Sequence, residues 1–177
     1  MFTRFLTPKF IEDIRRSIDT EPRLMLRDLA ERLGAPEGAV ARALPQDMRG
    51  FAPASVFDHV WEAMTSWSAI TFIAITPGLV LEFKGTLPKG SHGHGMFNLH
   101  TEGHPLGGHF MVARLGSICF LSKPFFGLES HSVQFYDQDG AVMCAIYAGR
   151  QGRDIVAEVR EAFMALRDEV CTQEEEA

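Results

Sequence analysis

The stretch HSVQFYDQDGAVMCAIYA, residues 131–148, decides the fold class of this chain. Its two ends are rich in valine, isoleucine, phenylalanine and tyrosine, the residue types that favour β-strands. Between them, the segment Asp137-Gln-Asp-Gly140 has the composition of a tight turn. We therefore predict two antiparallel strands, at 131–137 and 141–148, joined by this turn.

Short runs of the same composition precede this hairpin and are separated from one another by glycine or proline. They cover residues 69–75, 79–84, 96–100, 109–115 and 117–122. Seven short strands without helical segments between them predict a mainly antiparallel sheet, curled like a split barrel to hide its faces. With helices at both ends of the chain, the predicted fold class is α+β.

Helical patterns lie on both sides of the strand-rich region. Thr7 suits an N-cap and Pro8 suits the first position of a helix that ends near residue 20. Further helices are predicted at 26–33, 36–44 and 55–66, and a last one from about 152 to 167. We predict an N-terminal helical cap at 1–50, a sheet domain with flanking helices at 51–170, and a disordered acidic tail at 171–177.

The second and third predicted helices, joined by Gly34-Ala-Pro36, resemble a helix-turn-helix. A protein that binds nucleic acid neutralises many phosphates, but the net charge here is -6. The would-be recognition helix offers only Arg42 as a basic contact. We therefore predict a cap that packs on the sheet and no nucleic-acid partner.

The cysteines and the apolar runs indicate where the protein works. Three cysteines cannot all pair within one chain, and Cys119 and Cys144 lie in apolar, strand-like runs that suit reduced thiols. The longest apolar run, around 70–75, is far too short to span a bilayer, and the N-terminus resembles no signal peptide. We predict a cytoplasmic protein that is not inserted into a membrane.

Five of the seven histidines lie in one glycine-rich stretch between two predicted strands: His92, His94, His100, His104 and His109. Histidine nitrogen is the commonest metal ligand in proteins, so such a group can hold zinc, nickel, copper or a haem iron. A structural zinc site is disfavoured because no cysteine lies among them. The alternative is that these side chains are only polar and solvated.

Haem needs an axial donor, apolar contact on both porphyrin faces, and cationic or hydrogen-bonding groups at the propionate edge. The region around the histidines contains each type, with His109 or Met96 as the donor. The phenylalanines are Phe97, Phe110, Phe120, Phe125 and Phe126, and the cations are Arg114, Lys123 and Arg150. Core packing is the alternative role for each phenylalanine.

Five segments, taken in order, resemble the HutX/ChuX family of haem-utilisation proteins. They are GMFNL at 95–99, GHF at 108–110, KPFFG at 123–127, SVQFY at 132–136 and IYAGR at 146–150. Two shorter segments, RLGA at 32–35 and ALP at 43–45, resemble the helical N-terminal part of that family. The resemblance therefore runs, with gaps, through most of the chain.

This resemblance implies a cytoplasmic haem-binding protein of a bacterial haem-uptake system, assembled as a homodimer through its sheet. Such a protein takes imported haem as cargo and passes it to a haem-degrading or haem-using partner without catalysing a reaction. The alternative is a haem-degrading enzyme of the oxygenase type. No nucleotide-binding glycine motif, Ser-His-Asp set or carboxylate pair in the sequence supports an enzyme.

The resemblance also carries over to particular residues. Gly108-His109 matches the family's Gly-His segment, whose histidine is associated with haem. Two positions depart from the pattern: Ile75 stands where a histidine is common and Met96 where a tyrosine often stands. Methionine is itself a haem ligand type, and other histidines of the cluster can compensate. The predicted haem-binding residues are Met96, Phe97, His109, Lys123, Phe125, Phe126 and Arg150, with His109 as the iron ligand.

Overall fold

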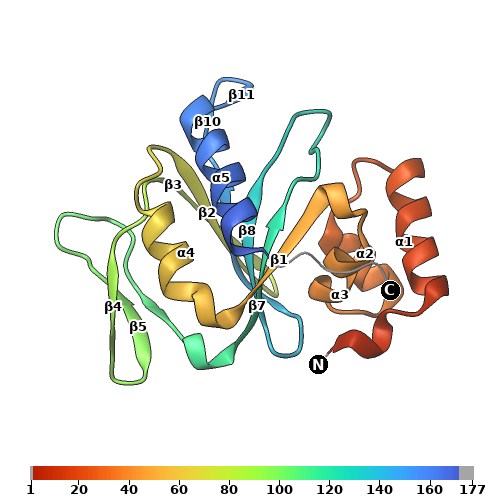
Figure 1. Cartoon of the computed structure of the whole chain (residues 1–177), viewed down its shortest axis with the longest axis horizontal. Helices are drawn as coiled ribbons and strands as arrows, with labels where there is room; N and C mark the ends of the chain where they lie inside the picture. Colours follow the sequence, from red (N-terminus) through yellow and green to blue (C-terminus); the bar gives the residue numbers. More distant parts are fainter. Residues whose placement is uncertain (1, 172–177) are drawn as a thin grey trace.

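The computed structural model describes residues 2–171 (Figure 1). Within them, five α-helices form: α1 (Pro8–Thr20), α2 (Leu26–Leu33), α3 (Glu37–Ala43), α4 (Phe57–Met64) and α5 (Ala157–Val170). None of these helices is both long and apolar enough to cross a lipid bilayer. The acidic tail predicted at 171–177 lies, apart from Cys171, outside the described residues.

Six strands form one antiparallel sheet in the order β1-β7-β8-β9-β2-β3. They are β1 (Arg49–Pro53), β2 (Ile70–Thr76), β3 (Leu79–Gly85), β7 (Leu115–Leu121), β8 (Ser132–Asp137) and β9 (Val142–Ala148). The sheet does not close on itself, because β1 and β3 remain as its two edges. The predicted α+β fold with a mainly antiparallel sheet is confirmed.

Two smaller ladders complete the strands of the described chain. A three-stranded sheet, which we call the small sheet, contains β4 (Gly90–Gly93), β5 (Met96–Leu99) and β6 (His109–Phe110). The other ladder pairs β10 (Arg150–Gln151) with β11 (Asp154–Ile155). Figure 1 shows the β4–β5 hairpin at one end of the molecule and helices α1 to α3 at the other.

Local sequence signals set the ends of several elements as predicted. The Thr7 hydroxyl accepts a hydrogen bond from the Phe10 amide at 3.2 Å and so caps α1. Gly34, with φ of 60°, ends α2 in the left-handed conformation that glycine favours. Between β8 and β9, the Asp137 carboxylate accepts hydrogen bonds from the amides of Asp139 and Ala141, each at 2.9 Å.

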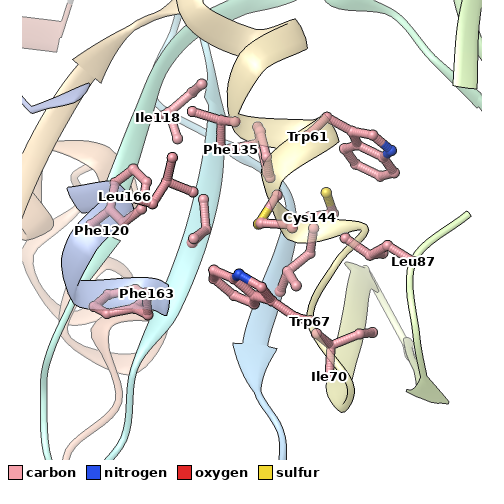
Figure 2. Close-up of a cluster of buried hydrophobic side chains, with 14 of the residues drawn as sticks. Trp61, Trp67, Ile70, Leu87, Ile118, Phe120, Phe135, Cys144, Phe163 and Leu166 are labelled. Atoms are coloured by element: carbon pink, nitrogen blue, oxygen red, sulfur yellow. The ribbon is translucent and has the colours of Figure 1, made fainter. Parts of the chain in front are cut away.

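One face of the large sheet carries the main hydrophobic core. Phe120 of β7 and Phe135 of β8 point to this face, where they meet α4 and α5. The ring of Phe163 on α5 lies 5.4 Å from that of Phe120 (Figure 2). Trp61 of α4 is buried in the same cluster, and its indole N–H is satisfied by the Pro88 carbonyl at 3.0 Å.

The opposite face of β1, β7 and β8 is covered by the N-terminal helices. Phe51 and Tyr136 point to this face and pack with Ile14 of α1 and Val40 of α3 in a second buried cluster. The first three helices therefore rest on the sheet. The division into a cap of residues 1–50 and a domain of residues 51–170 remains a prediction, and its boundary falls inside β1.

The three cysteines form no disulfide bond. Cys119 and Cys144 are buried in the sheet, one in each hydrophobic cluster, where each serves as a small apolar side chain. Burial raises the pKa of the Cys144 thiol, so this group stays protonated at neutral pH.

Three local predictions differ from the structure. β1, with sequence RGFAP, has weak strand propensity and forms because it pairs along its length with β7, while Pro53 occupies its last position. β4 lies where we predicted only a glycine-rich loop, because a tight turn holds it against β5. The strand predicted at 109–115 is interrupted by a 3-10 turn at Val112–Arg114, which leaves β6 with two residues.

The aromatic core yields a stability prediction. Phe135 is fully buried, and its ring lies 5.4 Å from Phe110 and 5.8 Å from Phe57. We expect Phe135→Ala to lower the free energy of unfolding by about 3–5 kcal/mol, because it leaves a cavity that its rigid neighbours cannot fill. Met111→Ala, at a side chain that is 54% exposed, serves as the control and should cost about 0.5 kcal/mol or less. Urea denaturation of both variants measures the difference, and a loss below about 1 kcal/mol for Phe135→Ala would contradict the described core.

Candidate functional site

The small sheet has two different faces, because successive side chains of a strand point to opposite sides. Phe97 of β5 pairs with Phe110 of β6, and Asn98 pairs with His109. Phe97 and Phe110 are buried, and both rings pack against Phe57 of α4 in the main core. Asn98 and His109 therefore lie on the other side, which we call the outer face.

Met96 lies on the outer face as well, since it is two residues before Asn98 on the same strand. The His109 ring is exposed, and its Nδ1 lies 2.7 Å from Oδ1 of Asn98. Met111 follows His109 by two residues and is 54% exposed. The outer face thus carries Met96 and the exposed imidazole of His109. Imidazole and thioether are both haem ligand types.

The other histidines of the cluster are held separately. His92 Nε2 contacts the Asp58 carboxylate of α4 at 2.7 Å, and His100 Nε2 contacts the Ser91 hydroxyl at 3.0 Å. His104 contacts the carbonyl of Thr86 at 3.1 Å, and His94 lies in the turn between β4 and β5. Within residues 2–171, no three His, Cys, Asp or Glu side chains gather in a way that could hold a metal ion. Among the described residues, the histidines that cluster in sequence therefore form no site with several histidine ligands.

The remaining predicted haem-binding residues surround the loop between β7 and β8. Lys123 donates to the carbonyl of Pro22 at 3.0 Å, and burial lowers the pKa of its amine. Phe125 and Phe126 are exposed and form an edge-to-face pair with ring centroids 4.5 Å apart. Arg150 donates to two backbone carbonyls, those of Glu129 and Arg153.

The side chains that hold this loop are not among the residues predicted to bind haem. His131 is buried between Ser122, whose hydroxyl lies 2.9 Å from Nδ1, and Glu129, whose carboxylate lies 2.8 Å from Nε2. Arg160 of α5 donates to the same carboxylate at 2.6 Å, and together these two partners hold the pKa of Glu129 below its usual value. Arg160 is 31 residues from Glu129, so no local sequence pattern indicates this contact.

The structure does not bring the two groups of predicted residues together within one chain. Met96 and His109 lie on the outer face of the small sheet, whereas the loop between β7 and β8 lies at the opposite side of the molecule (Figure 1). Phe97 belongs to the core and not to the outer face. Ile75, where the family often has a histidine, lies on β2 opposite Val80 of β3 and is 39% exposed.

This α+β chain, with its capped open sheet and its exposed strand-borne histidine, belongs to the haem-utilisation ChuX/HutX family, whose family model matches residues 51–166. The matched part contains the small sheet, nearly all of the large sheet and most of α5. The family resemblance seen in the sequence is therefore confirmed.

Three relatives resemble the chain over most of its length. The intracellular heme transport protein HutX of Vibrio cholerae is 28% identical over 159 residues, which span 89% of this chain and 82% of HutX. A structure of a protein from Erwinia carotovora is 34% identical, with a TM-score of 0.84 and coverage of 89% of this chain and 98% of that one. The structure of the heme binding protein ChuX is 31% identical, with a TM-score of 0.81 and coverage of 88% of this chain and 97% of ChuX.

A more distant likeness concerns the fold alone. The E. coli heme oxygenase ChuS is 19% identical, with a TM-score of 0.69. The match covers 84% of this chain but only 47% of ChuS. The same arrangement of strands and helices therefore occurs within a chain about twice as long.

Proposed function

We propose that this chain is a cytoplasmic haem carrier, which takes imported haem as cargo and passes it to a haem-degrading or haem-using partner. The observation that carries this proposal is the near full-length likeness to ChuX and HutX, which are described as a heme binding and an intracellular heme transport protein. The alternative, an oxygenase-type enzyme, is supported only by the fold likeness to ChuS.

Haem fits the chemistry of the outer face. The His109 imidazole is exposed on a strand, so its position is fixed by the ladder with β5 rather than by a mobile loop. Met96, on the same face, offers polarizable apolar contact and is a second donor type for iron. We assign the iron ligand to His109. Lys123, Phe125, Phe126 and Arg150 enter the same site only through another copy of the chain.

A homodimer is part of this proposal, and the edge strand β3 is its interface. Leu79, Val80 and Leu81 are consecutive, and each is more than half exposed. Natural proteins rarely leave such an apolar edge strand without a partner. A second copy of β3 pairing across a two-fold axis would satisfy the free backbone groups and cover these side chains.

Nucleic acid is not a partner in this proposal. In α3, the element at the position of a recognition helix, Gly38, Ala39 and Val40 are buried. Its single basic residue, Arg42, lies 3.9 Å over the ring of Phe51. A helix buried in this way against the sheet cannot enter a DNA groove.

The first prediction separates carrier from oxygenase. Purified protein loaded with hemin and supplied with ascorbate under air should keep its Soret band, because a carrier provides no oxygen-activating site for its cargo. The visible spectrum followed over hours measures this, with free hemin under the same conditions as the control. Loss of the Soret band together with biliverdin-like absorption would favour the enzyme.

The second prediction concerns the residue that binds the haem iron. His109→Ala should weaken hemin binding by about 10-fold or more, equivalent to about 1.4 kcal/mol, and shift the Soret maximum, since the iron loses an axial donor. His92→Ala, which removes an exposed histidine from the neighbouring strand β4, is the matched control and should change neither. If hemin affinity and the Soret maximum are unchanged in His109→Ala but altered in Met96→Ala, the iron ligand would be Met96 instead.

The third prediction concerns assembly. The wild-type chain should sediment at twice its mass of 19.7 kDa at micromolar concentration, and Leu81→Lys should sediment as a single chain. Placing a charge in a buried apolar interface costs several kcal/mol. Met25→Lys is the control, because Met25 is 36% exposed and precedes α2, which lies away from β3 (Figure 1). A wild-type chain that sediments only at 19.7 kDa would rule out the homodimer.

A further inference from the structure

The turn between β4 and β5 fixes the register of the small sheet. Its two residues, His94 and Gly95, have φ of 53° and 77°, so both adopt the left-handed conformation that a two-residue type I′ turn requires. With this turn, Gly93 lies opposite Met96 and Ser91 lies opposite Asn98. The Asn98 side chain is thereby held on the outer face beside the last residues of β4.

Backbone carbonyls determine which way the Asn98 amide faces. Its Nδ2 lies 3.0 Å from the carbonyl oxygen of Gly93, 3.3 Å from that of Ser91 and 3.4 Å from that of Met96. A carbonyl oxygen only accepts hydrogen bonds, so the group that faces these three atoms must be the NH2. The opposite orientation would place Oδ1 against three other oxygens. Gly93 leaves room for this arrangement, since a Cβ there would lie 3.2 Å from Nδ2.

With the NH2 committed to the carbonyls, Oδ1 of Asn98 faces Nδ1 of His109 at 2.7 Å. An amide oxygen carries no proton, so Nδ1 must donate in this contact. A neutral imidazole has a single ring proton, and Nε2 is then left with its lone pair. None of the residues within 2–171 is seen to hydrogen-bond to Nε2.

We propose that Asn98 is a positioning residue that holds the His109 proton on Nδ1 and presents the Nε2 lone pair for coordination, a role that rests on the proposed function of His109 as the haem ligand. Histidines that bind metals commonly donate a hydrogen bond from the N–H of the second ring nitrogen to such a partner. This contact fixes both the tautomer and the ring orientation. Asn98 serves as that partner before any haem is bound.

Comparison with His100 shows why the Asn98 side chain selects one tautomer of its partner. His100 contacts a hydroxyl, that of Ser91, at 3.0 Å. A hydroxyl can both donate and accept, so it allows either tautomer of the ring. His100 and His109 both have partners on the outer face. Only for His109 does the partner determine, before haem binds, which ring nitrogen is free to coordinate iron.

The direct test measures the tautomer in the full chain without haem. At about pH 8.5 an ordinary imidazole is neutral, and the 15N chemical shifts of the ring distinguish the protonated from the free nitrogen. We expect a protonated Nδ1 and a free Nε2 for His109 in the wild type, and a mixture of tautomers in Asn98→Ala and in Asn98→Leu. The leucine variant keeps the side-chain volume, so a packing effect of the smaller alanine is separated from the lost acceptor. Ser91→Ala is the matched control and should leave the His109 shifts unchanged.

Hemin titration supplies the second measurement. We expect both Asn98 variants to bind hemin about 10-fold more weakly than the wild type, as is typical when the partner of a metal-ligating histidine is removed. A wild-type His109 with its proton on Nε2, or shifts unchanged in the Asn98 variants, would overturn the proposal. If His109→Ala binds hemin as the wild type does, the assignment of the ligand fails, whereas the tautomer result is decided independently by the shifts.

Discussion

The pairing of β7 with β8 is the interaction on which the rest of the structure depends, because both faces of these strands are buried. Phe120 and Phe135 meet α4 and α5 on one face, while Cys119 and Tyr136 meet the N-terminal helices on the other. Polar groups between two apolar layers need partners within the protein. The Tyr136 hydroxyl accordingly donates to the Gln134 side chain, and burial raises the pKa of this tyrosine. The two hydrophobic clusters thus share one hydrogen-bonded sheet.

The parts of the fold that were predictable are those set by neighbouring residues. The cap at Thr7, the left-handed Gly34 and the Asp137–Gly140 turn each act over a few residues, so the sequence pattern reveals them. β1 was not predictable in this way, since its glycine and proline disfavour a strand and only the partner β7 makes it one. Tertiary contacts override local propensity at that point.

The site was predictable in part, and for a different reason. His109 was identified through the family resemblance to GHF at 108–110, and the structure places it beside Met96 on an exposed face. Asn98 was not singled out, because its role depends on three carbonyls that only the β4–β5 register brings together. A signal was nonetheless present: His94-Gly95 between two short polar–apolar runs has the form of a type I′ hairpin. Lys123 and Phe125 were grouped with His109 because they are close in sequence and share the family's segments, and neither property measures distance in the fold.

The exposure of the outer face bears on exchange kinetics under the proposed function. His109 projects from a sheet surface, so part of a haem held there would stay within reach of an approaching protein. Transfer to an acceptor that engages the cargo before it leaves would speed up as the acceptor concentration rises, whereas spontaneous loss to solvent would not. Such a carrier would retain its cargo when no acceptor is near and deliver it rapidly on encounter.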